Sequence, residues 1–566
     1  MKSYQTWFGD GPEPAILRML GLFDRPADEQ AFGALLKSPA IPGLTESLTD
    51  LRPTEWETTL AKLRRAKLLA REDPHNLGQL DTHPLVREYF GEQLRSQQPD
   101  AWKECNRRLF QYYQTLAPQL PNSFKDMEPL FSAVICGCEA GLFWGALHEV
   151  YISRIQRGTA SFAANFLGAR GALLSTLVHF FEHGRWGSPV QTGVEGQRLT
   201  VEDQLFILMQ AGHYLTATRG LAASEAGICY ERAVFLCDSL NRPLALHAAL
   251  MGQWHHSLDA STLPATMQIA QRLYSLAHEQ DNAALMIGAC NALGMTLFFF
   301  GDFGTAQQYL GQGLELWRSA GAPSVVEEVD VRAVSCLCYK AECDWHLGEV
   351  ASSHATISEA IRLAKRLNDS HGLTEALAEA LASAASLGHS ERNAAEVDRW
   401  ASELVELATR HRFATWRAVG FIFGGWARSA SGDTAAGLTW IEDGLRQWRT
   451  TGAVRVTPVW LTLKAEALHF GGHTGEALEA LKEAEALIES SDEREWCAEL
   501  HRLRSVFLTA MGADETRIEA SFGEAIRIAR EQKSVSLEKR AEATYAEYRR
   551  QKASGLGGPG FRLPLW

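Results

Sequence analysis

The 566-residue chain contains no uninterrupted apolar run near the roughly 20 residues that cross a membrane as a helix. Its first residues also lack the basic and then apolar pattern of a secretory signal. The ten cysteines are scattered along the chain and do not form the framework of a small secreted domain. We therefore expect reduced thiols, a cytoplasmic location and no membrane association.

Basic residues are also in deficit. The chain has 55 Lys and Arg against 68 Asp and Glu, a formal net charge of −13. A general nucleic-acid-binding surface normally shows a basic excess, so the balance argues against nucleic acid as the main partner. The overall charge balance still permits a local basic patch. Hydrophobic residues make up 46% and charged residues 22%, which indicates a globular chain rather than a disordered one.

Motifs that carry chemistry are missing as well. The sequence has no phosphate-binding GxxxxGK[ST] loop, no HExxH, no GxSxG and no calcium-binding EF-hand loop. The cluster of Cys336, Cys338, Cys343 and His346 offers at most three converging ligands on a helix, whereas structural zinc takes four. We therefore predict a protein that is not an enzyme and needs no metal or cofactor.

What the chain does contain is a repeated pair of helices beyond residue 200. The stretch "LGMTLFFFGDFGTAQQYLGQGLELW" places Gly294, Gly301, Ala306, Leu310 and Gly313 at the offsets of a tetratricopeptide repeat. Similar offsets recur in "AECDWHLGEVASSHATISEAIRLA", "GWARSASGDTAAGLTWIEDGLRQW" and "AEALHFGGHTGEALEALKEAEALI". Small residues let two helices cross closely, and large apolar residues fill the seam with the next pair.

These patterns predict a mainly α fold, with an N-terminal winged helix followed by a right-handed α-solenoid of tetratricopeptide-like helix pairs. Residues 1–95 read as short helices, a small β-hairpin at "KLLAREDPHNLGQLDTH" and a closing helix, which is a winged-helix plan. Residues 96–200 are predicted to be an irregular helical connector. Residues 201–552 hold the solenoid, and 553–566 form a flexible tail with an apolar tip.

Aromatic residues offer candidates for partner binding. Solenoids bind partners on their concave face, largely through the first helices of the pairs. Repeat arrays also bury aromatic residues between helices, so the core is the alternative position for the same side chains. The candidate groove residues are Trp416, Arg417, Trp426 and Trp460.

The last residues, "ASGLGGPGFRLPLW", change character because Gly and Pro forbid a helix. The segment is either a disordered tail or a short docking segment. Its docking candidates are Phe561, Leu563, Leu565 and Trp566.

The third N-terminal helix supplies the alternative function. It holds Lys62, Arg64 and Arg65, and in a DNA-reading winged helix this element enters the major groove. Glu55 and Glu57 share the helix, which favours a solvated or domain-facing position. The alternative is therefore a transcription regulator that reads DNA through Arg64 and Arg65 while the array senses an inducer.

The stretches "GPEPAILRMLGLFDRPADEQAFGALL", "LDTHPLVREYFGEQLR" and "AWKECNRRLFQYY" resemble the winged-helix end of bacterial STAND proteins, the signal-transduction ATPases with numerous domains. The repeats, above all "ALGMTLFFFGDFGTAQQYLGQGLELW" and "EREWCAELHRLRSVFL", resemble the tetratricopeptide sensor arrays of the same class. The resemblance spans about residues 10–550 and leaves out the ATPase core. We expect the chain to be a piece of a larger ATPase, a stand-alone sensor, or the partner of a separate ATPase chain.

In that family a His at the start of the closing helix contacts the phosphate of the nucleotide and locks the resting state. His83 lies at this position, and Pro84 follows it where the immune-receptor form has Asp, so the full motif is not present. The alternative for His83 is a simple helix-start residue. The resemblance implies a sensor that binds a protein, peptide or small ligand on its repeats and relays binding to an ATPase or effector, in bacterial antiviral defence or stress signalling.

Overall fold

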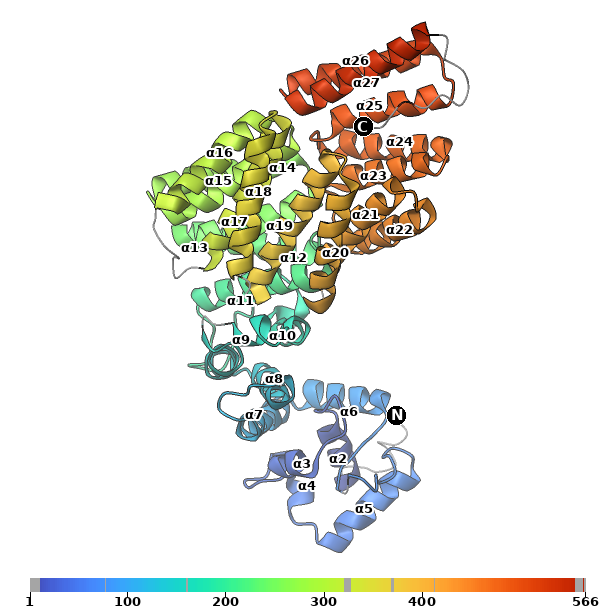
Figure 1. Cartoon of the computed structure of the whole chain (residues 1–566). Helices are drawn as coiled ribbons and strands as arrows, with labels where there is room; N and C mark the ends of the chain where they lie inside the picture. Colours follow the sequence, from blue (N-terminus) through green and yellow to red (C-terminus); the bar gives the residue numbers. More distant parts are fainter. Residues whose placement is uncertain are drawn as a thin grey trace. The chain divides into compact units, whose positions relative to one another are not determined.

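Two compact units make up the chain, Met1–Ile207 and Leu208–Trp566, and each is described by itself (Figure 1). No described helix is long and apolar enough to cross a membrane. The computed structural model describes residues 11–76, 78–158, 161–319, 327–367, 371–411, 413–554 and 563.

Unit 1 begins with short helices around a small apolar core. α2 packs on α6, and also contacts α4 and α5. Ala27 and Leu80 form an isolated antiparallel bridge, and the Ala70 amide donates to the Asp81 carbonyl at 2.8 Å. In the described part of residues 66–83 this bridge is the only β pairing, so the hairpin and the winged helix stay predictions. The first helices are α2 (Pro12–Leu20), α3 (Glu29–Leu35), α4 (Glu46–Thr49), α5 (Pro53–Arg65) and α6 (Pro84–Gln97).

The rest of unit 1 is helical but irregular. Its middle element, η1, is a π-helix, a form that is rare beyond single turns. Arg154 of η1 is buried and donates to the carbonyls of Gln114 and Ala117, both at 3.0 Å, which fixes the end of α7. The elements are α7 (Pro99–Leu116), α8 (Phe124–Glu139), η1 (Gly145–Gln156), α9 (Phe162–Asn165), α10 (Arg170–Leu177), η3 (Val178–Phe180) and η4 (Glu182–Gly184).

Unit 2 is a stack of helix pairs. α11 (Val201–Arg219) crosses the boundary between the units, and each later helix packs on the next one along the chain. From α13 onward each odd-numbered helix also contacts the next odd-numbered helix, so these helices line the inner side of the curve. The even-numbered helices form the outer layer. This confirms the predicted α-solenoid of helix pairs.

The first half of the array comprises α12 (Ser224–Ser239), α13 (Pro243–Ala260), α14 (Leu263–Glu279), α15 (Ala283–Phe299), α16 (Phe303–Ser319), α17 (Glu327–His346), α18 (Val350–Leu367) and α19 (His371–Ser390). The second half comprises α20 (Ala394–His411), α21 (Ala414–Ala430), α22 (Thr434–Thr450), α23 (Thr457–Phe470), α24 (Thr474–Ser491), α25 (Cys497–Ala510), α26 (Glu515–Glu531) and α27 (Val535–Ala553).

The turns within pairs depend on glycine. Gly301, Gly348, Gly432 and Gly472 have φ values of +80°, +84°, +102° and +83°. A Cβ is disfavoured at such positive φ values, so glycine ends each inner helix without strain. These are the residues whose spacing predicted the repeat.

The tightest pair is α21 with α22, where glycines let the two backbones touch. A Cβ added at Gly425 would lie 2.6 Å from the Gly437 carbonyl oxygen and 2.9 Å from the Ile441 nitrogen. Gly425→Ala is therefore expected to cost about 1–3 kcal/mol of unfolding free energy through overpacking. Gly475→Ala in α24 is the matched control, because a Cβ there meets nothing within 4 Å. Urea denaturation of both variants measures the difference, and equal midpoints would contradict the close packing.

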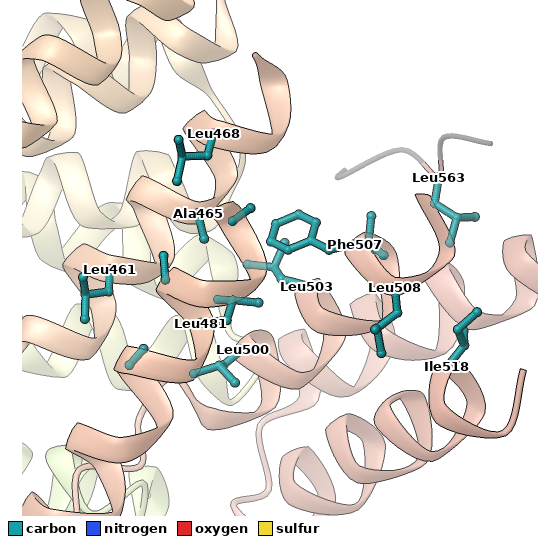
Figure 2. Close-up of a cluster of buried hydrophobic side chains, with 14 of the residues drawn as sticks. Leu461, Ala465, Leu468, Leu481, Leu500, Leu503, Phe507, Leu508, Ile518 and Leu563 are labelled. Atoms are coloured by element: carbon teal, nitrogen blue, oxygen red, sulfur yellow. The ribbon is translucent and has the colours of Figure 1, made fainter. Parts of the chain in front are cut away.

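The end of the array has its own apolar core, which Figure 2 shows in close-up. Leu503 and Phe507 of α25 pack there with Ile518 of α26. Leu563 of the C-terminal segment joins the cluster and is only 2% exposed. One of the four predicted tail residues thus packs on the chain itself. The other three, Phe561, Leu565 and Trp566, lie outside the described residues.

Candidate functional site

Inner helices of unit 2 and the turn after α19 bring five charged side chains together. Arg392, which follows α19, pairs with both Glu466 of α23 and Glu499 of α25. Glu499 Oε1 also accepts from Arg502 Nη2 at 2.7 Å and lies 3.4 Å from Arg540 Nη1 of α27. The first four side chains are at most 4% exposed. We call these five residues the central ion network.

The network keeps both carboxylates ionised. Burial alone would raise the pKa of Glu466, but Arg392 and His389 lower it to about 2. Burial likewise opposes ionisation of Glu499, and Arg502, Arg540 and Arg392 hold its pKa well below the usual range. Burial lowers the pKa of Arg540 to about 10, against the pull of Glu499. Three guanidinium groups therefore share two carboxylates in a water-poor interior.

Aromatic rings enclose the network. Trp426 Nε1 donates to Glu466 Oε2 at 3.0 Å, and His389 Nε2 lies 3.2 Å from Glu466 Oε1. The His389 ring meets Trp426 edge-on at 4.6 Å and lies 5.7 Å from Trp496. Such rings exclude water, so the hydrogen bonds within the network act at low dielectric and are strong.

A second cluster holds more acids than bases. Arg455 Nε donates to Asp259 Oδ1 of α13 at 3.1 Å, and the Glu493 carboxyl accepts from the Val456 amide at 3.1 Å. Glu495 Oε1 is buried and has no hydrogen-bond partner among the described residues. Burial raises the pKa of Glu493 to about 8 and that of Glu495 well above its usual range. We call Asp259, Arg455, Glu493 and Glu495 the acidic cluster.

Three sets of contacts join the first half of the array to loops of the second half. The Val454 amide donates to the Asp259 carbonyl at 3.2 Å, and the Arg494 amide donates to the Phe299 carbonyl at 2.7 Å. His346 Nδ1 lies 2.9 Å from Ser534 Oγ, where α17 meets α27. We call these the closing contacts. They place the chain's own loops on the inner face, which is the surface that solenoids use for ligands.

The predicted groove residues divide between core and partial burial. Trp426 is 0% exposed and Trp460 is 6% exposed, so both pack between helices. Trp416 and Arg417 are half-buried, and Arg417 Nε donates to Gln447 Oε1 at 2.9 Å. Of the four, Trp426 reaches the central ion network directly. A role for the set in partner binding stays a prediction.

The predicted residues of unit 1 lie at separate positions. His83 is exposed at the start of α6, and its Nδ1 accepts from the Leu85 amide at 3.3 Å. This is the geometry of a helix-start residue, and contact with a nucleotide stays a prediction. Arg64 lies 3.8 Å from Glu72, whereas Arg65 is exposed at the end of α5.

Comparison with known proteins identifies relatives without fixing a family. No family model matches the chain. An uncharacterized protein of Rhizobium meliloti (strain 1021) is 26% identical over 351 residues, which cover 61% of this chain. The chain spans only 33% of the length of that curated relative.

Among solved structures, a STAND protein with a tetratricopeptide-repeat sensor from Pyrococcus horikoshii matches with a TM-score of 0.36 and 13% identity, over 88% of this chain and 65% of that one. A Rap protein complexed with competence and sporulation factor matches with a TM-score of 0.41 and 13% identity, over 62% and 97%. Yeast Tom70 gives a TM-score of 0.33 and 12% identity, over 83% and 94%. All three scores are below 0.5, so the function proposed next rests on the residues of this chain.

Proposed function

We propose that this chain is a regulatory sensor that binds a protein or peptide on its repeat array and relays binding to an ATPase or effector partner. One observation carries the proposal, namely that the central ion network lies buried where the closing contacts join the two halves of the array. A sensor needs two conformations for which a ligand has different affinities, and opening or closing these contacts supplies them.

Buried charges suit a switch better than a static core. Replacing a buried ion pair with apolar residues is often neutral or stabilising, so such pairs are weak devices for stability alone. They do fix one arrangement, because any other arrangement leaves a charge unpaired in the interior. Arg392, Glu499 and Arg540 come from three different repeats, so a shift of one repeat breaks several pairs at once.

Unit 1 is the proposed output of the sensor. Under this proposal its first helices form the winged helix, and His83 contacts the nucleotide of a partner ATPase. What supports this role is the exposed position of His83 at the start of α6. The resemblance to STAND regulators extends the proposal to bacterial antiviral defence or stress signalling.

Capture of partners from the native host tests the proposal. Arg540→Ala is expected to change the recovery of one defined protein at least about fivefold. The substitution weakens the central ion network and leaves the sequence of unit 1 unchanged. Arg399→Ala is the matched control, since Arg399 is exposed on the outer helix α20 and pairs only locally with Glu396. Quantitative mass spectrometry compares both variants with the intact chain. Equal recovery from all three chains would contradict the proposal, and so would recovery of DNA alone.

A further inference from the structure

The start of α27 is bound at the end of α17 by polar contacts. Ser534 lies just before α27, is fully buried, and its Oγ is 2.9 Å from His346 Nδ1. Ser536 Oγ donates to the Trp345 carbonyl, in the last turn of α17. The Trp345 carbonyl also accepts from the Gly348 amide at 3.0 Å, so the Ser536 hydroxyl adds a second hydrogen bond at this helix end.

Arg540 makes the same kind of contact at the end of the next inner helix. Its Nη2 donates to the carbonyl of Ser390, the last residue of α19. The guanidinium carbon lies 5.3 Å from the centre of the Trp345 ring. The negative end of a helix dipole attracts a cation, and an aromatic ring attracts it further. The end of α19 and the Trp345 ring of α17 therefore form a receptor for an arginine.

Apolar contacts complete the fit. Leu537 is 1% exposed, and Val535 lies against the turn after α17. A Cβ at Gly348 would lie 3.0 Å from Val535 Cγ1, and Gly348 also has a φ of +84°. Gly348 therefore permits the positive φ of the turn and also leaves the space that the Val535 side chain occupies. Residues 534–540, with the sequence SVSLEKR, are called the docking segment.

The docking segment is held in a way that allows exchange. Most of its contacts to α17 and α19 are single hydrogen bonds, and α27 is the last described helix of the array. α27 packs mainly on α25 and α26 and contacts α17 at fewer positions, and an element at the end of an array opens at lower free energy than elements in its middle.

We propose that the ends of α17 and α19 form a docking site for a helix start of the pattern Ser-x-Ser-Leu-x-x-Arg, which the docking segment fills within the chain and which a partner protein carrying the same pattern takes over. This inference rests on the proposed function, because displacement of the segment is then the event that opens the array. The recognition chemistry is two hydroxyls, one leucine and one arginine at helical spacing.

A peptide of residues 532–549 with a fluorescent label is the probe. The full chain with Ser534→Ala and Arg540→Ala holds its own segment weakly, so the site is open more often. Apparent affinity rises with the open fraction, and the double variant is expected to bind the peptide at least about tenfold more tightly than the unaltered chain. Arg549→Ala is the control, because Arg549 is exposed near the other end of α27. Fluorescence anisotropy measures all three affinities.

The sequence specificity of peptide binding tests the proposed docking site. A peptide with Ala at the positions of Ser534, Ser536 and Arg540 is expected to bind the double variant at least about tenfold more weakly. Equal binding of both peptides, or no gain over the unaltered chain, overturns the proposal. If circular dichroism shows that the double variant is unfolded, hydrogen exchange on the unaltered chain replaces it. Saturating peptide must then speed exchange in α27 and leave the end of α17 protected, and unchanged exchange overturns the proposal.

The two tests fail separately. If lysate capture yields a defined partner while the peptide does not bind, the docking site is wrong and the sensor function stands. If the peptide binds with the expected specificity but no partner is captured, the docking site stands and the proposed relay is wrong.

Discussion

Replacing Glu499 with Ala is expected to lower the unfolding free energy of unit 2 by about 3–5 kcal/mol, the cost of breaking a buried ion pair from one side. Glu499 is 1% exposed and is the shared partner of Arg392, Arg502 and Arg540. Without it, three buried guanidinium groups share only Glu466. No side chain within the network can replace the lost charge.

Urea denaturation followed by tryptophan fluorescence measures this loss, because most of the tryptophans belong to unit 2. Glu396→Ala is the matched control. Glu396 pairs with Arg399 at 2.8 Å on the exposed outer face of α20, and such surface pairs contribute about 0–1 kcal/mol. A loss below about 1 kcal/mol for Glu499→Ala would show that water reaches the network and compensates the arginines.

The repeat architecture could be predicted because its signals are local. The offsets from Gly294 to Gly313 reflect two helices that follow each other in the chain and cross closely. In the structure a Cβ at Gly294 would lie 2.5 Å from Leu310 Cγ, and one at Gly313 would lie 3.2 Å from Cys290 Cβ. The turn glycine Gly301 adopts the positive φ that its position between the two helices required. Local spacing was therefore enough to predict the pairs.

The central ion network could not be predicted in the same way. Arg392 and Glu499 are 107 positions apart, and His346 and Ser534 are 188 positions apart. Such contacts depend on how far the array turns per repeat, which is a sum of small crossing angles that no single spacing encodes. The available signal was a charge placed among apolar neighbours, as for Glu466 in "LKAEALHF".

The tryptophans show the same limit from the other direction. The aromatic content of the repeats predicted Trp426 and Trp460 as groove residues. Because α21 and α23 are apolar on several faces, their periodicity did not distinguish inner from outer positions. The structure buries both rings, and Trp426 reaches the candidate site through its hydrogen bond to Glu466 and its contact with the His389 ring. Partner contacts of the array therefore have to be sought through its movements as well as its surface.

Unit 2 is also expected to lose stability as the pH rises from about 7 to 8. Burial raises the pKa of both Glu342 and Glu493 from 4.5 to about 8, so the folded state keeps these protons at neutral pH while the unfolded chain releases them. A group whose pKa is higher in the folded state stabilises that state at low pH, and this contribution is lost as the pH rises. Each such proton gives a slope of about 1.4 kcal/mol per pH unit.

Buried histidines and network carboxylates restrict this pH dependence to the range above about pH 7. Burial lowers the pKa of His346 to about 3, and it also lowers the pKa of His389 and His255. These histidines are protonated only in the unfolded chain at mildly acidic pH, so below about pH 7 they give a substantial slope of the opposite sign. The carboxylates of the central ion network titrate lower still, with Glu466 at about 2. Above pH 7 the unfolded histidines are about one quarter protonated or less, because their ordinary pKa is about 6.5, and the network carboxylates stay ionised.

Glu493→Gln isolates the acidic cluster within that window. The groups that face Glu493 are Asp259, Arg455, Glu495 and the Val456 amide, and only one of them is a cation. A neutral amide keeps the acceptor for Val456 and needs no proton. The variant is therefore expected to be up to about 3 kcal/mol more stable than the unaltered chain at pH 7. Its unfolding free energy is also expected to fall less steeply with pH, by about 1.4 kcal/mol per pH unit.

Denaturation at several pH values compares the Glu493→Gln variant with Glu483→Gln, whose carboxyl is about half exposed on α24 and pairs with Arg449. An unchanged slope would mean that Glu493 is ionised in the closed array. A reduced slope would instead show that the acidic cluster binds a proton at Glu493, so that acid stabilises the folded array and base destabilises it.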